Sequence, residues 1–149
     1  MNVFSVSKTP PNTQKYPLHS HSHWEIMYYL EGEGVLATEG ADIPFSKGSI
    51  IIVPPGLVHG SKAQCGFVNI SIGSDFDKLF MFDKVVATSD NSDFDGKQLA
   101  LLIYKNQHKS DNFLSSLCSV YAHFILQNLT CEKNICRAVS EIVDAVLSR

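Results

Sequence analysis

The hydrophobic and polar positions of this 149-residue chain follow two patterns, which change over near residue 95. Between about residues 16 and 72, short apolar runs alternate with turns that contain glycine or proline, which is typical of antiparallel β-structure. This part of the chain predicts a small barrel or a sandwich. We expect its strands over residues 25–30, 35–38, 49–53 and 67–72, and a further strand that begins at His59.

From about residue 95 onwards, apolar residues recur at the spacing of an amphipathic helix. Asp111 and Thr130 are candidate N-caps for the second and third of the expected helices. The fold class is therefore mainly β with a C-terminal α portion. We expect residues 1–94 to form the barrel with an N-terminal arm, and residues 95–149 to form a helical dimerisation or linker segment packed on it. Its two or three helices are expected over residues 96–107, 112–129 and 132–147.

The apolar stripe of the second expected helix is wider than one helix needs to pack on one sheet. Either this stripe covers the outer face of the β core, or two such helices from two copies form a dimer interface. We favour a homodimer, since closed two-fold dimers are the commonest oligomers. The expected interface residues are Leu114, Leu117, Tyr121, Phe124 and Ile125.

Composition and charge exclude several classes of function. The formal net charge is −3 and no basic cluster occurs, which argues against nucleic-acid binding by this chain itself. No apolar stretch approaches the roughly 20 residues that cross a bilayer, and the N-terminus lacks the pattern of a signal peptide. The four cysteines form no C-x-x-C pair, as is usual for reduced thiols. We therefore expect a cytoplasmic protein that makes no membrane contact.

The candidate chemistry begins with His19, His21, His23 and Glu25, which alternate along one stretch of chain. In a straight strand, His19 and Glu25 would lie about 20 Å apart, at ~3.3 Å per residue. That separation is too large for one metal ion with ligand bonds of about 2 Å. A bend at residues 22–24 would fold Glu25 back beside His19 and His21, and it would leave the direction of His23 open.

His59 completes a set of three imidazoles and one carboxylate if the fold brings it to the same rim. It follows a turn that contains Pro54, Pro55 and Gly56. Such a donor set suits one divalent transition metal, namely zinc, nickel, manganese, iron or copper, with a position left open for water or another ligand. Isolated polar strand residues are the alternative interpretation of the histidine run.

These two stretches resemble the two motifs of the cupin superfamily. In the first motif, Thr13 stands at the leading glycine position, and the other places are filled by His19, His21, Glu25 and Gly32. In the second, Ala63 stands at the closing asparagine position, and the other places are filled by Gly48, Pro54, Gly56 and His59. The resemblance implies a small, jelly-roll-like antiparallel β-barrel. It also implies that the metal ligands are His19, His21, Glu25 and His59.

A cupin barrel followed by helices is similar in layout to the N-terminal effector-binding and dimerisation domain of AraC-type transcription regulators. This second resemblance implies a ligand-sensing domain rather than an enzyme. Its effector would be a sugar or another small molecule, bound with or without a metal. DNA would be contacted only through a C-terminal domain beyond Arg149. The alternatives are a stand-alone metal-dependent cupin enzyme of the dioxygenase or sugar isomerase type, and a purely structural cupin that dimerises.

Effector contacts are expected from the barrel interior, its rim and the N-terminal arm. Met27 and Tyr29 share strand parity with Glu25 and should face inwards. Ordinary core packing is the alternative for Met27, Tyr29 and Trp24, and a frayed terminus is the alternative for the arm. Asn69 faces either the interior or solvent. The full set of candidates is Tyr16, His23, Trp24, Met27, Tyr29 and Asn69.

Overall fold

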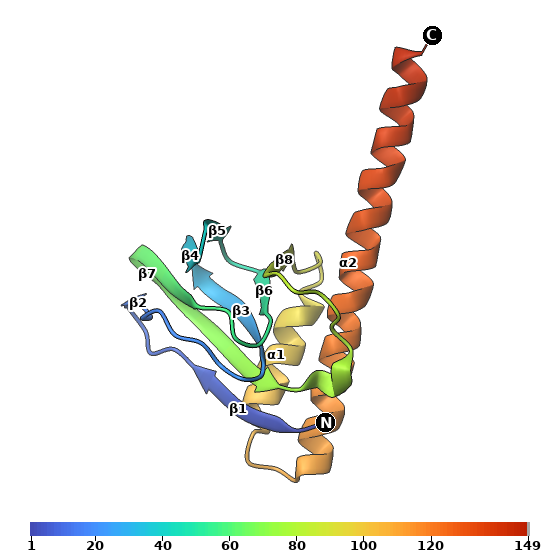
Figure 1. The fold of residues 1–149 in the computed structure, drawn as a ribbon. Helices are drawn as coiled ribbons and strands as arrows, with labels where there is room; N and C mark the ends of the chain where they lie inside the picture. Colours follow the sequence, from blue (N-terminus) through green and yellow to red (C-terminus); the bar gives the residue numbers. More distant parts are fainter. Residues whose placement is uncertain (149) are drawn as a thin grey trace.

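The computed structural model describes residues 1–148, with side chains described for residues 1–132 and 141–148. It is a nearly closed antiparallel β-barrel followed by helices, which confirms the expected fold class (Figure 1). The helical elements are a 3-10 turn (Phe76–Lys78), α1 (Asp95–Lys105) and α2 (Asp111–Leu147). The strands are β1 (Val3–Lys8), β2 (Thr13–Lys15), β3 (Trp24–Gly32), β4 (Gly34–Thr38), β5 (Ala41–Phe45), β6 (Ser49–Val53), β7 (His59–Ser74) and β8 (Val86–Ser89).

Strand β7 organises the barrel because it pairs with four other strands. Its first part pairs with β4 and β2, and its second part pairs with β3 and β1. The sheet order is β5-β4-β7-β3-β6-β8, with β1 and β2 both on β7. The expectation of two separate strands, one from His59 and one over 67–72, is wrong. Gly66 has a φ of 90°, so the strand accommodates an irregularity there without ending.

The N-terminal arm is an ordered part of the sheet. Strand β1 runs antiparallel to β7, from the pair Val3 and Ser74 to the pair Lys8 and Ile70. The frayed-terminus alternative is therefore wrong. The arm forms a wall of the barrel because Ser5, Val6, Ser7 and Lys8 each face a partner across the ladder, which satisfies the backbone.

The two faces of β3 contribute to two different hydrophobic clusters, since successive strand residues point to opposite sides. Met27 and Tyr29 face the barrel interior with Leu36, Phe45, Ile51 and Phe67. Ile26 and Tyr28 face outwards and pack in a cluster that includes residues of α1 and α2. Barrel and helices therefore share one apolar cluster, and Figure 1 shows both helices on one side of the strands.

Helix α2 is a single continuous helix of 37 residues, so the two helices expected over 112–129 and 132–147 are one. Thr130 does not cap a new helix, because its hydroxyl donates to the carbonyl oxygen of Leu126 inside α2 at 3.0 Å. The N-cap is Ser110 rather than Asp111, and its side chain accepts from the Phe113 N–H. The C-terminal part of α2 extends beyond the barrel (Figure 1).

The residues expected at a dimer interface pack within the chain itself. Leu114, Tyr121 and Ile125 are buried in the cluster between the helices and the outer face of the sheet. Leu117 and Phe124 are partly buried against the same cluster. The wide stripe of α2 therefore covers the β core, and Leu114, Tyr121 and Ile125 are corrected from expected interface residues to core residues. Tyr121 and Ile125 are 0% exposed, so a second copy has no access to them.

Two sequence-based expectations concern the chain as a whole. Within the part of the chain that the structure describes, no helix combines the length and apolar character needed to span a membrane. Cys65, Cys118 and Cys131 are free thiols, and Cys136 lies outside the described side chains. The division at residue 94 into a barrel and a helical segment stays a prediction.

Candidate metal centre

Four side chains from three segments meet at one end of the barrel. His19 and His21 lie on the segment between β2 and β3, Glu25 is the second residue of β3, and His59 opens β7. The chain bends at Ser22 and His23, as the distance argument requires. Backbone hydrogen bonds fix this arrangement, because His19 and His59 exchange N–H···O bonds of 3.0 and 2.9 Å in an isolated bridge.

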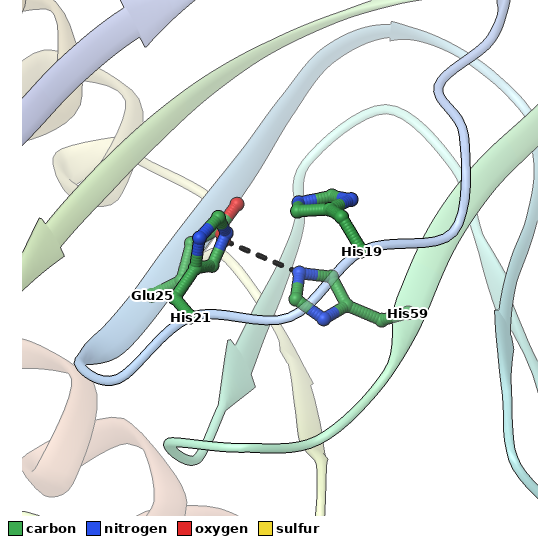
Figure 2. A group of neighbouring side chains, drawn as sticks. All are labelled: His19, His21, Glu25 and His59. Atoms are coloured by element: carbon green, nitrogen blue, oxygen red, sulfur yellow. Dashed lines mark hydrogen bonds and ion pairs between the residues drawn. The ribbon is translucent and has the colours of Figure 1, made fainter.

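One carboxylate oxygen is shared by two imidazoles. Glu25 Oε2 lies 2.5 Å from His21 Nε2 and 3.2 Å from His59 Nε2 (Figure 2). His19 completes the group, and one donor atom from each of the four residues lies within 4.8 Å of the others. Glu25 and His59 are buried, whereas His19 and His21 are half-buried. Two of the four donor residues are thus partly accessible to solvent.

Two of the imidazole rings are oriented by a hydrogen bond between Nδ1 and a backbone carbonyl oxygen. His19 Nδ1 lies 2.8 Å from the carbonyl oxygen of Pro17, and His59 Nδ1 lies 2.8 Å from that of Leu57. A carbonyl accepts only from a protonated Nδ1, so in the neutral tautomer Nε2 carries the free lone pair. This is the support that metal-ligating histidines usually have.

The electrostatics of the metal-free cluster favour a charged pair. Burial by itself raises the pKa of Glu25, but the His59 hydrogen bond and the nearby imidazoles outweigh it, and the pKa lies below its ordinary value. Burial lowers the pKa of His59, yet its bonds to Glu25 and to the Leu57 carbonyl leave the pKa raised. A buried carboxylate beside imidazoles is a site in which a bound cation can take the place of protons.

The donor chemistry fits a divalent transition metal. Three imidazole nitrogens and one carboxylate oxygen converge, and bonds of about 2 Å to one ion require donors only a few ångströms apart. The donor atoms of the cluster all lie within 4.8 Å of one another, and two of them lie 2.5 and 3.2 Å from the carboxylate oxygen. This group of residues could hold a metal ion.

A cavity of about 280 Å³ adjoins the cluster. Four of the expected effector contacts line it, namely Tyr16, His23, Met27 and Asn69. The direction of His23, which the sequence left open, is towards this cavity. Its ring stacks on His21 at 4.9 Å and on Phe4 at 5.2 Å, and burial is the main cause that lowers its pKa.

Two expected effector contacts lie elsewhere. Trp24 belongs to the outer face of β3 and packs on Phe80 and Phe82, with ring centroids 5.5 and 5.3 Å away, so the prediction of a rim position is corrected. Tyr29 faces the interior but is fully buried behind the cavity lining. Its ring stacks on Phe45 and its hydroxyl lies 2.7 Å from Ser61 Oγ. Trp24 points to the outer face of β3 because it precedes Glu25 directly, and successive side chains of a strand point to opposite faces.

Sequence reasoning missed the hydroxyl groups that line the cavity. The missed residues are Ser5, Ser7, Thr9 and Ser61, and Ser71, whose direction the alternation along its strand left open, also lines the cavity. A signal was present, because the segment from Ser5 to Thr9 alternates hydroxyl side chains with Val6 and Lys8. That alternation is typical of a strand with one polar face.

The comparisons with known proteins agree with this geometry. Residues 5–64 match the family model described as a cupin domain. A search of curated proteins gives no match. One similar solved structure is a cupin-2 domain protein from Shewanella frigidimarina, at 20% identity over 45% of this chain and 64% of that chain, with a TM-score of 0.39. Another is a predicted oxalate decarboxylase from Thermotoga maritima, at 28% identity over 46% and 61%, with a TM-score of 0.39. The chain spans less than two thirds of either structure.

A more extensive likeness is to apo ToxT from Vibrio cholerae. The identity is 6%, the TM-score is 0.62, and the match covers 87% of this chain and 56% of that chain. At this identity the likeness concerns the fold alone, and it extends beyond the strands into the helices. The segment that matches the cupin family model, residues 5–64, contains all four donor residues and most of the barrel strands.

Proposed function

We propose that this chain is the ligand-sensing domain of an AraC-type transcription regulator, in which a small effector binds beside a divalent transition metal. The observation that carries the proposal is the cavity of about 280 Å³ that opens onto the cluster of His19, His21, Glu25 and His59. The fold likeness to ToxT, an AraC-family regulator, supports it because the likeness includes the helices.

The residues of the site have separate roles in this proposal. His19, His21, Glu25 and His59 would hold zinc, nickel, manganese, iron or copper, which when bound supplies a Lewis-acidic contact for an effector oxygen. The carbonyls of Pro17 and Leu57 keep two imidazoles oriented. Glu25 neutralises one unit of the added positive charge inside the buried end of the barrel.

Sensing requires that the site and the helices respond to one another. Glu25 lies on β3, and the outward-facing residues of the same strand pack against α1 and α2. An effector that binds one arrangement of β3 and the helices better than another would shift the population between them. We propose DNA contact only through a domain outside this chain.

A stand-alone metal-dependent cupin enzyme, of the dioxygenase or sugar isomerase type, is the second candidate. The observation that favours it is that the cavity is open beside the donor cluster, so a substrate could reach a bound metal. Turnover of a substrate by the metal-loaded chain alone would support this candidate and contradict the sensor proposal.

The test of the metal site is isothermal titration of chelator-stripped protein with Zn²⁺ and Ni²⁺. We expect one equivalent of metal per chain, and we expect His59→Ala to weaken binding by at least roughly tenfold, since even supporting residues are worth that much. His108→Ala is the matched control because His108 is an exposed histidine outside the cluster. Wild-type protein that binds neither metal, or a His59→Ala variant that binds both as tightly, would contradict the proposal.

We further propose that the chain is a homodimer through the distal part of α2, where the second copy would cover exposed apolar residues. Ile142, Val143, Val146 and Leu147 share one side of the helix and are 48–78% exposed. Sedimentation should give a dimer for the wild type and a monomer for Val146→Glu. Ser148→Glu, on the opposite side of α2, should remain dimeric. A wild-type monomer would refute this interface.

A further inference from the structure

Three strands place their inward-facing residues in register beneath the cavity. In the first row, nearest the donor cluster, Gly73 of β7 pairs with Ser5 of β1 and with Glu25 of β3. In the second row, Ser71 pairs with Ser7 and Met27. Rows that are two residues apart along a strand are separated by roughly 6.6 Å. The cavity wall therefore leads away from the metal cluster in regular steps.

The third row continues the same polar surface. Asn69 of β7 lies beside Thr9, and the Asn69 N–H donates to Thr9 Oγ1 at 2.9 Å. Both side chains line the cavity, as do Ser5, Ser7 and Ser71. Two facing lines of hydroxyl and amide groups thus extend from the cluster, one on β1 and one on β7. Ser5 and Ser7 are exposed, so their hydroxyls are available to a ligand.

The wall carries hydroxyl and amide groups on a largely apolar surface, and it carries no charge outside the donor cluster. Among the described residues, no lysine, arginine or aspartate lines the cavity, and its single carboxylate is Glu25 in the donor cluster. Hydroxyl and amide groups donate and accept hydrogen bonds, so they pair with ligand hydroxyls and reject apolar chains, which would leave them unpaired. An anionic ligand group would find an opposite charge at a cation held by the cluster.

At the end of the wall beside the cluster, Gly73 lets two polar side chains approach the backbone of β7 closely. A Cβ atom at Gly73 would lie 2.5 Å from His23 Nε2 and 2.6 Å from Ser5 Oγ, so both polar atoms occupy the space that glycine leaves free. His23 Nε2 is buried and makes no hydrogen bond within the described residues. His23 is outside the four-donor group, so it is not a candidate metal ligand.

We infer that the ligand has one metal-binding end and an uncharged tail that carries several hydroxyl groups. This inference rests on the proposed function of the metal cluster. The metal-binding end lies at Glu25, within reach of His23 and Ser5. The tail runs along the second and third rows, where Ser7, Ser71 and Asn69 bind its hydroxyls. The cavity volume is at the small end of the range for ligand pockets, so the tail is only a few carbons long.

The test compares probes that share one metal-binding end and differ in their tails. Glycolate, α-hydroxyhexanoate and the hexonates gluconate, galactonate and mannonate all carry an α-hydroxycarboxylate. They would be titrated calorimetrically into Ni²⁺-loaded protein that has been dialysed to remove free metal. We expect one or more of the hexonates to bind roughly tenfold or more tightly than α-hydroxyhexanoate, since several hydrogen bonds differ between them.

Single serine variants connect this preference to the wall. Ser7→Ala and Ser71→Ala should each weaken hexonate binding by roughly three- to tenfold, the effect of one hydrogen bond, and leave glycolate binding unchanged. Ser46→Ala, an exposed serine that does not line the cavity, is the matched control and should change neither. Circular dichroism and unchanged Ni²⁺ affinity would establish that each variant is folded.

Each outcome identifies which idea fails. Protein that does not retain Ni²⁺ would overturn the proposed metal site, and this inference with it. Protein that retains Ni²⁺ and binds glycolate, but prefers no hexonate over α-hydroxyhexanoate, would overturn the inference alone. A hexonate preference that survives in both serine variants would likewise overturn the assignment of the tail to β1 and β7.

Discussion

Asp90 links β3, the strand that carries Glu25, to the start of α1. Replacing Asp90 should therefore lower the free energy of unfolding measurably. The Tyr28 hydroxyl on the outer face of β3 donates to Asp90 Oδ2 at 2.5 Å. The same carboxylate accepts from the N–H groups of Gly96 and Lys97, both at 2.9 Å, in the first turn of α1. It therefore acts as the N-terminal cap that Phe94, the residue before α1, does not provide.

The magnitude follows from the groups that Asp90→Ala would leave unpaired. Tyr28 is 1% exposed, and an orphaned buried hydroxyl costs about 1–3 kcal/mol. Loss of a helix cap costs about 0.5–2 kcal/mol. Together we expect a loss of about 1.5–5 kcal/mol in the free energy of unfolding. Asp90→Asn keeps a neutral acceptor in place and should lose less than Asp90→Ala.

Urea denaturation followed by circular dichroism measures these losses, provided that the transition is two-state. A double-mutant cycle with Tyr28→Phe isolates the link between β3 and α1. We expect a coupling energy of about 1 kcal/mol or more, because one buried hydrogen bond to a charged group is removed by either change. A loss below about 1 kcal/mol for Asp90→Ala, or additive single losses, would refute this reasoning.

Two further predictions concern the donor cluster and the glycine beside it. Because the pKa of His59 is raised on folding, His59 adds stability that is complete below about pH 6.5 and is lost as pH rises through its folded-state pKa. Because the pKa of Glu25 is lowered on folding, Glu25 adds stability that is present above pH 4.5 and is lost as pH falls through its folded-state pKa. In metal-free protein, thermal unfolding of the wild type and of Glu25→Gln should therefore differ most between pH 4.5 and 6.5, and a constant difference from pH 4 to 9 would contradict the charged pair. Gly73→Ala would crowd His23 and Ser5, so urea denaturation should show a loss of about 1–3 kcal/mol. A variant as stable as the wild type would show that both side chains can move aside.

Local sequence predicted the parts of the fold that depend on local chemistry. The alternation of Met27 and Tyr29 with Ile26 and Tyr28 correctly assigned the two faces of β3. The bend at residues 22–24 followed from bond lengths and strand rise alone, since no straight strand brings His19 to Glu25. Such features involve only neighbouring residues and the fixed geometry of the backbone.

The predictions for the helices were less accurate, because an apolar stripe on a helix does not indicate which surface packs against it. The same stripe on α2 serves a dimer interface or an intramolecular core equally well. The structure buries Tyr121 and Ile125 against the sheet, and it leaves apolar residues exposed further along the helix, among them Ile142 and Val146. Which surface a helix covers depends on the position of the sheet, which lies far away in sequence.

By itself, then, the sequence determined that His19, His21 and Glu25 can share one site only if the chain bends between His21 and Glu25, because a straight strand would hold them too far apart. Only the tertiary structure decided which distant groups join them. His59 is 34 residues from Glu25, and it reaches the shared carboxylate because the start of β7 pairs with β4 and forms a backbone bridge with His19. The hydroxyl wall likewise exists only because Ser7 and Ser71, at opposite ends of the barrel sequence, face each other across β1 and β7. Register is a property of the closed sheet, since a slip of one residue would turn every one of these side chains to the other face.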